Sequence, residues 1–159
     1  ETAAALVALR PTVIRGNASE ILALSGADAA GKGVDAADGV QAAETGASAL
    51  ARRVGAVVAV TGPVDFVTDG TRAFRISNGH PTMPQVTALG CSLTGVVGAF
   101  LVGQPALEAT VAALAYYGLA GEVAAEGAKG PASFATAFVD ALAILTPQDL
   151  SAGAKVAVA

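Results

Sequence analysis

Residues 56–79, "AVVAVTGPVDFVTDGTRAFRISNG", decide the fold of this chain. The opening "AVVAVTG" is a short apolar run rich in valine, which predicts a buried strand. After it the pattern changes, because "DFVTDGTRAFRISNG" alternates apolar and polar residues around Asp69-Gly70, a dipeptide that favours tight hairpin turns. The stretch therefore predicts an antiparallel hairpin joined to an otherwise parallel sheet.

The segments on either side alternate between helix and strand. Before the apolar run we predict the end of a helix at 3–9, a strand at 12–16, a helix at 17–26, a glycine-rich loop at 31–39 and a helix at 40–54. After the hairpin we predict helices at 92–102, 107–127 and 133–145, and a last strand at 155–159. This order is typical of an α/β protein with a mostly parallel sheet and helices on both faces.

The composition limits the class of protein. The 159 residues are 53% hydrophobic and 14% charged, which excludes a disordered chain. A membrane span needs about 20 apolar residues, but the apolar stretch 93–102 is shorter and 107–123 contains Glu108 and Glu122. We expect buried helices and no membrane partner. The net charge is −4 and the largest basic cluster is the pair Arg52-Arg53, so we expect no nucleic-acid partner.

The single cysteine and the first residues bear on the cell compartment and on the extent of the chain. One cysteine permits no internal disulfide, which agrees with a reducing cytoplasm, and no signal peptide is visible. The sequence opens inside a helical pattern without an initiator methionine. We therefore expect residues 1–159 to be the later portion of one domain in a longer protein.

The segment "VTALGCSL", residues 86–93, places Cys91 where a helical pattern begins. Gly90 permits a tight turn, and the amides of Leu89, Gly90 and Cys91 can point at one spot near the positive end of the helix. This arrangement would bind an anion. Alternatively, Cys91 is a small apolar residue that fills the top of a core helix.

The segment "IRGNASEI", residues 14–21, also has two interpretations. Asn17 and Glu20 have the spacing of a capping box, which satisfies free amides at a helix start. Alternatively, Glu20 holds magnesium near phosphates and Arg15 neutralises their charge, because ligands of open α/β sheets gather at the carboxyl ends of strands. Thr61 ends the strongest strand, and Gly62 after it allows a close backbone approach.

Two further motifs are predicted to have structural roles only. The stretch "GADAAGKG", residues 26–33, lacks the final Ser or Thr of a phosphate-binding loop and follows a predicted helix instead of a strand. We interpret it as an ordinary loop. His80, the only histidine, has no potential metal-binding partners nearby in the sequence, so we expect it to support the chain reversal after the hairpin.

Taken in order, these motifs resemble the hydroxyethylthiazole kinase family of the ribokinase-like superfamily. The resemblance covers essentially the whole chain and rests on "IRGNASEI", "GKGVD", "VAVTGPVDFVTDG", "ISNGHP", "VTALGCSL", "ALAYYGLAGEVAAE" and "GPASF". Most ribokinase-like enzymes have an aspartate where this sequence has Cys91, and the cysteine is a mark of the thiazole kinases. The chain resembles the C-terminal part of the family, whose first strands precede this point.

The resemblance implies an enzyme that transfers the γ-phosphoryl group of ATP, with Mg²⁺, to the hydroxyl of 4-methyl-5-(2-hydroxyethyl)thiazole in thiamine salvage. It also implies a ribokinase-like fold, a cytoplasmic location and a homotrimer. The residue roles that it implies are ATP contact by Arg15 and Thr61, magnesium binding by Glu20 and Asn17, thiazole contact by Ala88, an anion hole at Leu89 and Gly90, and a catalytic Cys91 that takes the hydroxyl proton or positions the hydroxyl.

One departure from the family pattern lies in the same loop. The family's "TGTGC" or "TGAGC" is "TALGC" here, so Ala88 replaces a glycine and Leu89 replaces a small residue. Alanine suits this position only where a negative φ suffices. Two other functions therefore stay open: a hydroxymethylpyrimidine or other small-alcohol kinase of the superfamily, and a relative that binds ligands without catalysis.

Overall fold

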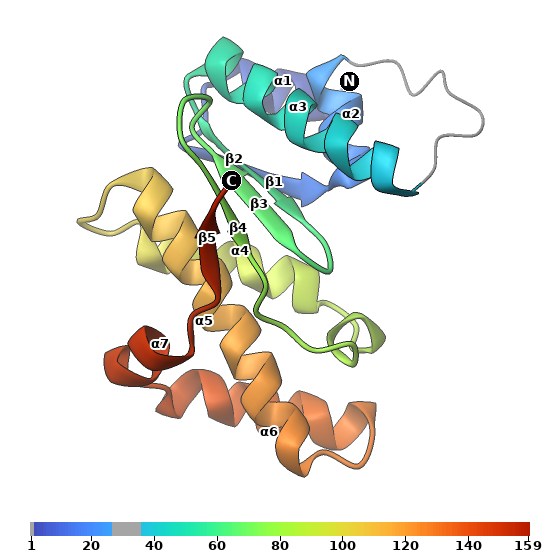
Figure 1. Ribbon diagram of the computed structural model, residues 1–159, viewed down its shortest axis with the longest axis vertical. Coiled ribbons are helices and arrows are strands. Elements are labelled where there is room, and N and C mark those ends of the chain that lie inside the picture. The colour runs from blue at the N-terminus through green and yellow to red at the C-terminus, as the bar shows by residue number, and fades with distance from the viewer. Residues whose placement is uncertain (1, 27–35) are drawn as a thin grey trace. The chain divides into compact units, whose positions relative to one another are not determined.

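The computed structural model describes residues 2–26 and 36–159 of the chain (Figure 1). The chain divides into two compact units, Glu1–Arg75 with Val158–Ala159 and Ile76–Ala157, which we call the first and the second unit. The elements in chain order are α1 (Thr2–Ala8), β1 (Val13–Asn17), α2 (Ala18–Ser25), α3 (Ala36–Val54), β2 (Val57–Thr61), β3 (Asp65–Thr68), β4 (Ala73–Ile76), the 3₁₀ turn η1 (Met83–Gln85), α4 (Leu89–Phe100), α5 (Ala106–Gly127), α6 (Pro131–Ile144), α7 (Pro147–Gly153) and β5 (Val156–Val158).

The five strands form one sheet in the order β1-β2-β3-β4-β5. β1 runs parallel to β2, with Asn17 opposite Thr61 at the carboxyl ends of both strands. β2 runs antiparallel to β3, with Val58 opposite Thr68. The sheet is thus mixed, with a parallel pair that meets an antiparallel strand at β2, and the predicted hairpin turn joins β3 to β4.

The hairpin turn lies at Asp69-Gly70, as predicted. Oδ1 of Asp69 accepts hydrogen bonds from the amides of Thr71 at 2.8 Å and Arg72 at 2.7 Å. Gly70 has φ +90°, a conformation that residues with a Cβ rarely adopt, and a Cβ there would lie 3.0 Å from the backbone nitrogen of Arg52. The turn therefore requires its glycine.

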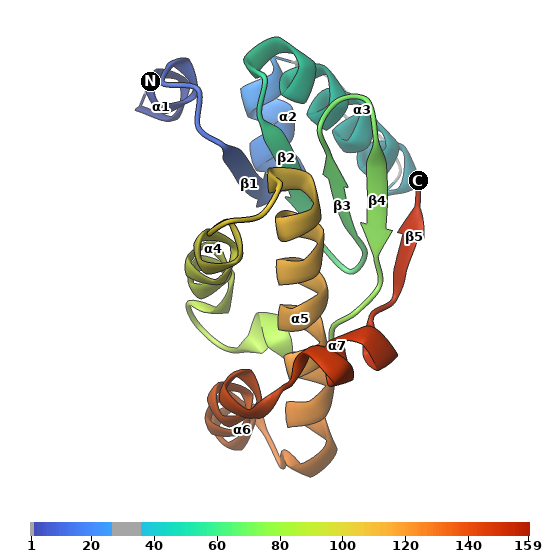
Figure 2. The same cartoon turned by 90° about the vertical axis from the view of Figure 1, so that its left-hand side faces the viewer.

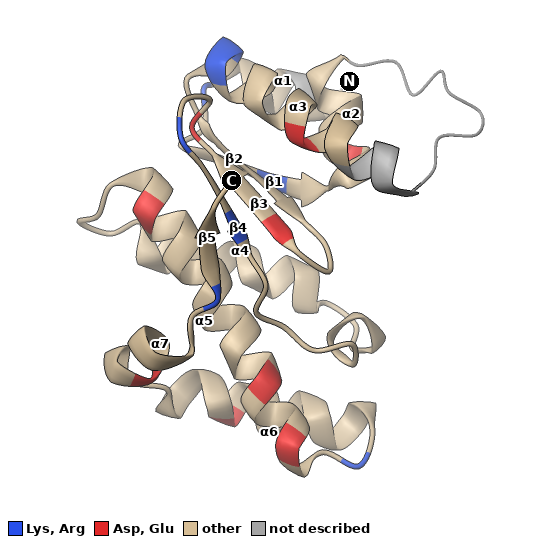
Figure 3. Cartoon of the chain, viewed as in Figure 1, with Lys and Arg blue, Asp and Glu red and all other residues tan. Residues whose placement is uncertain are grey.

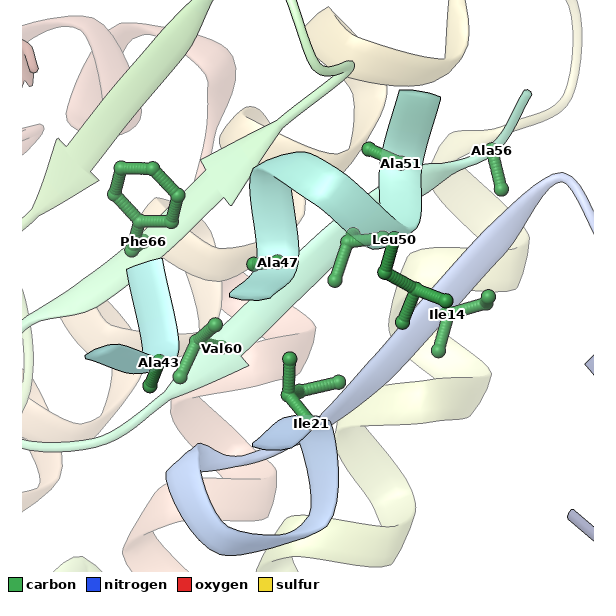
Figure 4. Close-up of a cluster of buried hydrophobic side chains, with 10 residues drawn as sticks. Ile14, Ile21, Ala43, Ala47, Leu50, Ala51, Ala56, Val60 and Phe66 are labelled. Atoms are coloured by element: carbon green, nitrogen blue, oxygen red, sulfur yellow. The ribbon is translucent and has the colours of Figure 1, made fainter. Parts of the chain in front are cut away.

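The core of the first unit lies between its helices and its strands. α2 and α3 pack against each other and against β1 and β2. Ile21, Leu50 and Val58 are fully buried in this core, and Figure 4 shows Ala47 and Leu50 of α3 near Val60 and Ile14 of the strands. Burying one such large side chain contributes about 1.5–3 kcal/mol, so this core holds the carboxyl edge of β1 and β2 in place.

Three differences between the observed and the predicted helices exceed two residues. α3 begins at Ala36, so the predicted loop at 31–39 is wrong over 36–39; the rest of that loop and residues 27–33 of "GADAAGKG" lie outside the described residues. One glycine inside a helix costs only about 1 kcal/mol, and alanine favours helix. α4 begins at Leu89, three residues earlier than predicted, and α7 was not predicted.

The second unit is built around α5, which packs against α4, α6 and α7 (Figure 2). Two glycines of α5 permit close approach by the chain that follows the hairpin. A Cβ on Gly118 would lie 2.6 Å from the backbone of Asn78, and a Cβ on Gly121 would lie 2.5 Å from Sδ of Met83. Within residues 2–26 and 36–159, no helix combines the length and the apolar character needed to cross a membrane.

Hydrogen bonds and an ion pair link the start of the second unit to its end. The Asn78 side chain donates to Oε1 of Glu122 at 3.1 Å and to the carbonyl of Gly153 at 2.9 Å. The Lys155 amide donates to Oδ1 of Asn78 at 2.7 Å, and Nζ of Lys155 lies 2.8 Å from Oε2 of Glu122. Asn78 is buried, so these bonds satisfy polar groups that would otherwise cost stability.

The basic pair Arg52-Arg53 ends α3 and binds backbone carbonyls of the first unit. Arg53 donates to the carbonyls of Ser25 and Leu24, both at 2.9 Å, at the end of α2, and Arg52 donates to Gly70 at 2.8 Å. Figure 3 shows the other Lys and Arg positions of the described chain as short segments spread over several elements. Both guanidinium groups of the pair therefore help to hold this unit together.

Candidate functional site

The carboxyl edge of β1 and β2 brings Arg15 and Thr61 together. Nη1 of Arg15 donates to Oγ1 of Thr61 at 3.3 Å, and the threonine hydroxyl donates to the Gly16 carbonyl at 3.3 Å. Both side chains are half-buried. Because open α/β sheets bind ligands at the carboxyl ends of parallel strands, this edge is the candidate site of the first unit.

Asn17 and Glu20 form the capping box at the start of α2. Oδ1 of Asn17 accepts from the Glu20 amide at 2.9 Å and from Oγ of Ser19 at 2.8 Å, and Oε2 of Glu20 accepts from the Asn17 amide at 2.8 Å. Gly16 permits this approach, since a Cβ there would lie 3.0 Å from Oε2 of Glu20. The capping interpretation is thus confirmed, and the magnesium role of the two residues stays a prediction.

Glu20 and Asn17 differ in how well they fit a magnesium ion. Mg²⁺ is commonly held by one or two carboxylates together with phosphates and water, and Glu20 is an exposed carboxylate at the strand edge. The Asn17 amide oxygen already accepts two hydrogen bonds, which fill its lone pairs. Glu20 therefore suits the ion better than Asn17 does, and both magnesium roles stay predictions. In the described ranges, no group of three or more His, Cys, Asp or Glu residues could hold a metal.

Asp65 is a residue of this edge that the sequence analysis missed. Its Oδ1 accepts from the Gly62 amide at 2.9 Å and closes the turn that follows Thr61. Burial raises the pKa of Asp65 to about 6, although the Gly62 amide and the positive charge of Arg15 lower it. The signal in the sequence was an aspartate at the end of "TGPVD", where the next strand begins. The edge therefore contains a carboxyl group whose pKa of about 6 lies above its ordinary value of 3.8.

The start of α4 holds the predicted residues of the second unit. Ala88 precedes the helix with φ +69°, and its carbonyl accepts from the Ser92 amide at 2.9 Å. The expectation that Gly90 makes the turn is wrong, because Gly90 lies inside the helix and the left-handed residue is Ala88. The amides of Leu89, Gly90 and Cys91 belong to the first turn, where helical amides have no partner within the helix.

The Cys91 side chain is exposed on the first turn of α4. The side chains that follow Cys91 have other environments: Leu93 is buried, and Oγ of Ser92 donates a hydrogen bond to the Leu89 carbonyl. The interpretation of Cys91 as a filler of the core is therefore wrong. The structure leaves the thiol of the described chain accessible to a small molecule.

A second residue that the sequence analysis missed is Tyr117 of α5. Its hydroxyl donates to the Leu89 carbonyl at 2.6 Å and lies 2.6 Å from Oγ of Ser92. Tyr117 is buried, and buried tyrosine hydroxyls usually find a hydrogen-bond partner. The signal was a tyrosine within an otherwise apolar helical segment.

His80 supports the chain reversal, as expected. Its Nδ1 lies 3.1 Å from Oγ1 of Thr82, its carbonyl accepts from the Met83 amide at 2.9 Å, and its ring stacks on Phe134 with the ring centroids 6.3 Å apart. These contacts give His80 a structural role in the reversal.

Comparison with known proteins identifies the family. The model of the hydroxyethylthiazole kinase family matches residues 1–148. The chain belongs to the hydroxyethylthiazole kinase family. A hydroxyethylthiazole kinase of Cereibacter sphaeroides is 69% identical over 152 residues, which are 96% of this chain and 58% of that protein. One from Gemmatimonas aurantiaca is 60% identical over 151 residues, 95% of this chain and 54% of that protein.

A solved structure supports the same family. The structure of a hydroxyethylthiazole kinase protein from Pyrococcus horikoshii matches with a TM-score of 0.85 at 35% identity, covering 96% of this chain and 57% of that chain. The α/β fold of a hydroxyethylthiazole kinase is thereby confirmed. The chain spans less than two thirds of the length of the relatives that it matches.

Proposed function

We propose that the protein to which this chain belongs phosphorylates the hydroxyl of 4-methyl-5-(2-hydroxyethyl)thiazole with ATP, as a step of thiamine salvage. It does so in the cytoplasm as a homotrimer, and residues 1–159 form the C-terminal portion of its single kinase domain. Family membership and the names of the relatives support this proposal. The observation that carries it is the 3.3 Å contact between Arg15 and Thr61 at the carboxyl edge of two parallel strands.

On the nucleotide side, Arg15 and Thr61 bind ATP. Phosphoryl transfer depends mainly on positioning the reactants and neutralising their charge. The Arg15 guanidinium is permanently charged, and the hydrogen bond to Thr61 restricts its position at the strand edge. Glu20 holds Mg²⁺, which neutralises phosphate charge when bound, and the cap from Asn17 fixes the direction of that carboxylate.

On the acceptor side, the start of α4 receives the thiazole alcohol. Ala88 contacts the thiazole, and the amides of Leu89 and Gly90 stabilise the transferred phosphoryl group. The acceptor oxygen forms a bond to the γ-phosphorus as the bond from that phosphorus to the bridging oxygen of ADP breaks. Cys91 positions the hydroxyl or takes its proton.

Turnover assays on the full-length protein test the proposal. Purified protein with ATP and Mg²⁺ is supplied separately with hydroxyethylthiazole and with hydroxymethylpyrimidine, and the phosphorylated product is measured by mass spectrometry. We expect turnover with hydroxyethylthiazole. Turnover with hydroxymethylpyrimidine alone would replace the proposed acceptor, and calorimetric binding of ATP or the thiazole without any product would make the protein a non-catalytic relative.

A further inference from the structure

We propose that Tyr117 is a positioning residue for the acceptor side of the reaction, acting through the first turn of α4 and together with Ser92. This inference rests on the proposed function, because Tyr117 affects the reaction only if Cys91 acts on the acceptor hydroxyl. The interaction lies entirely within the second unit, between α4 and α5.

Three oxygen atoms carry the inference. The Tyr117 hydroxyl lies 2.6 Å from the Leu89 carbonyl and 2.6 Å from Oγ of Ser92, and Oγ of Ser92 donates to the same carbonyl at 3.0 Å. The three atoms lie within hydrogen-bond distance of one another, and the two hydroxyl protons make two of these three contacts hydrogen bonds at any one time. Leu89 and Ser92 lie on either side of Gly90 and Cys91, so these contacts constrain the turn that holds both residues.

The Tyr117 ring is held as firmly as its hydroxyl. The residue is buried, and its ring meets Phe138 of α6 edge to face, with the centroids 4.8 Å apart. Phe138 is itself buried and stacks on Phe134. The Tyr117 hydroxyl therefore contacts α4 from a ring that is buried against α6.

The turn needs such support because its backbone is strained. Ala88 has φ +69°, and a left-handed residue with a Cβ is less stable than a glycine there. Gly90, Cys91 and Ser92 are exposed on this turn. The hydrogen bonds of Tyr117 and Ser92 constrain this turn.

The neighbouring Tyr116 provides a matched control. It is also in α5, and its hydroxyl donates to a backbone carbonyl, that of Leu142 in α6. Tyr116→Phe and Tyr117→Phe therefore remove the same hydroxyl and one bond to a carbonyl each. Only Tyr117→Phe removes hydrogen bonds to α4, because the contact of Tyr116 with α4 is made by its ring against Phe100, and phenylalanine keeps that ring.

The experiment compares both variants in the full-length protein. For Tyr117→Phe we expect kcat with hydroxyethylthiazole to fall roughly tenfold, since small errors in position reduce rates strongly, while KM for ATP stays within about twofold. For Tyr116→Phe we expect both constants to stay within about twofold. Equal kcat values in the two variants would overturn the proposal.

A second measurement does not depend on turnover. The rate at which iodoacetamide alkylates Cys91, read on the tryptic peptide by mass spectrometry, should rise in Tyr117→Phe and not in Tyr116→Phe. If the wild-type protein turns over no thiazole, the proposed function fails, and the alkylation rates still decide whether Tyr117 constrains this turn. Should Tyr117→Phe fail to fold, Ser92→Ala must produce the same change in alkylation rate, and an unchanged rate would overturn the proposal.

Discussion

Nη1 of Arg15 lies 3.3 Å from Oγ1 of Thr61, although 46 positions separate the two residues in the chain. The contact exists because β1 and β2 are parallel and in register, with Asn17 opposite Thr61. Two strands that run in the same direction place their carboxyl ends at one edge, which gathers side chains from distant segments. The edge also includes Asp65, whose carboxylate accepts from the amide after Thr61.

Arg15→Ala should raise KM for ATP by roughly 10- to 150-fold. One hydrogen bond to a charged group contributes about 1.5–3 kcal/mol, and Arg15 is half-buried at the edge without being part of the core cluster. Steady-state kinetics of the full-length enzyme measure this change, with the melting temperature as the check on folding. Arg72→Ala is the control, because Arg72 pairs with Asp69 at the opposite end of β3. Unchanged ATP kinetics in Arg15→Ala would remove Arg15 from the site.

Glu20→Gln should weaken the dependence on magnesium more than it weakens folding. A glutamine keeps an oxygen that accepts from the Asn17 amide, as Oε2 of Glu20 does at 2.8 Å, but it loses the charge. A magnesium titration of the rate measures the first effect, and a thermal melt measures the second.

The capping box of α7 offers a control for that pair of measurements. Thr146 and Asp149 form the same motif as Asn17 and Glu20, so Thr146→Ala should lower stability by about 1 kcal/mol with an unaltered magnesium titration. If Glu20→Gln also lowers stability and leaves the magnesium titration unaltered, the Glu20 carboxylate caps α2 and does not bind magnesium.

Ala88→Gly should stabilise the protein by about 0.5–1 kcal/mol. Ala88 has φ +69°, and glycine adopts this conformation without the clash that a Cβ causes. Urea unfolding of the full-length protein measures the gain. Ala99→Gly, at an exposed position inside α4, should change the stability by a similar amount with the opposite sign. A loss of stability in Ala88→Gly would contradict the strain at this residue.

Asp65→Asn should change how stability depends on pH. Burial raises the pKa of Asp65 to about 6, from an ordinary value of 3.8, so the folded protein keeps a proton that the unfolded chain releases. Stability therefore falls as the pH rises from about 4 to 6 and stays lower above that, by about 3 kcal/mol at about 1.4 kcal/mol per pH unit. The variant lacks this penalty, so its stability relative to the wild type should rise over the same range.

Asp69→Asn is the matched control for the pH series. Burial alone would raise the pKa of Asp69, but the amides of Arg72 and Thr71 and the Arg72 side chain outweigh it, and the net effect lowers the pKa below 3.8. The folded state then gains stability above about pH 4 that the variant lacks, which is the opposite sign. Urea unfolding at several pH values measures both variants. Parallel pH curves for Asp65→Asn and the wild type would contradict the raised pKa.

Cys91→Asp should keep kinase activity, and Cys91→Ala should lose rate with little change in KM for ATP. A carboxylate can accept a proton or a hydrogen bond from the acceptor hydroxyl, whereas a methyl group can do neither. A loss of about 10²–10⁴-fold in kcat indicates general-base help, and a smaller loss indicates positioning. Cys91→Ser further distinguishes the general-base role from the positioning role, because a serine can still form a hydrogen bond to the acceptor hydroxyl but is a poor base. An alanine variant with wild-type kinetics would show that Cys91 has no part in the reaction.

Local sequence patterns were sufficient for much of the fold and for part of the site. The run at 57–61, the turn at Asp69-Gly70 and the capping box at Asn17 were each predicted and found. Each depends on chemistry within a few residues: burial of a short apolar run, a glycine at positive φ, and side chains that cap nearby amides. The order of such motifs was also enough to indicate the family that the comparisons then confirmed.

The tertiary structure decided the features that join distant segments. Pairing of β1 with β2 sets Arg15 against Thr61, packing on α5 brings Tyr117 to the Leu89 carbonyl, and burial at the strand edge raises the pKa of Asp65 to about 6. The turn before Cys91 also depends on the tertiary structure, since Ala88 adopts a left-handed conformation that an alanine does not favour locally. Features of this kind arise only when several elements pack together. Residues nearby in the sequence supply neither the partner of such a hydrogen bond, nor the burial that shifts the pKa, nor the contacts that hold a strained φ.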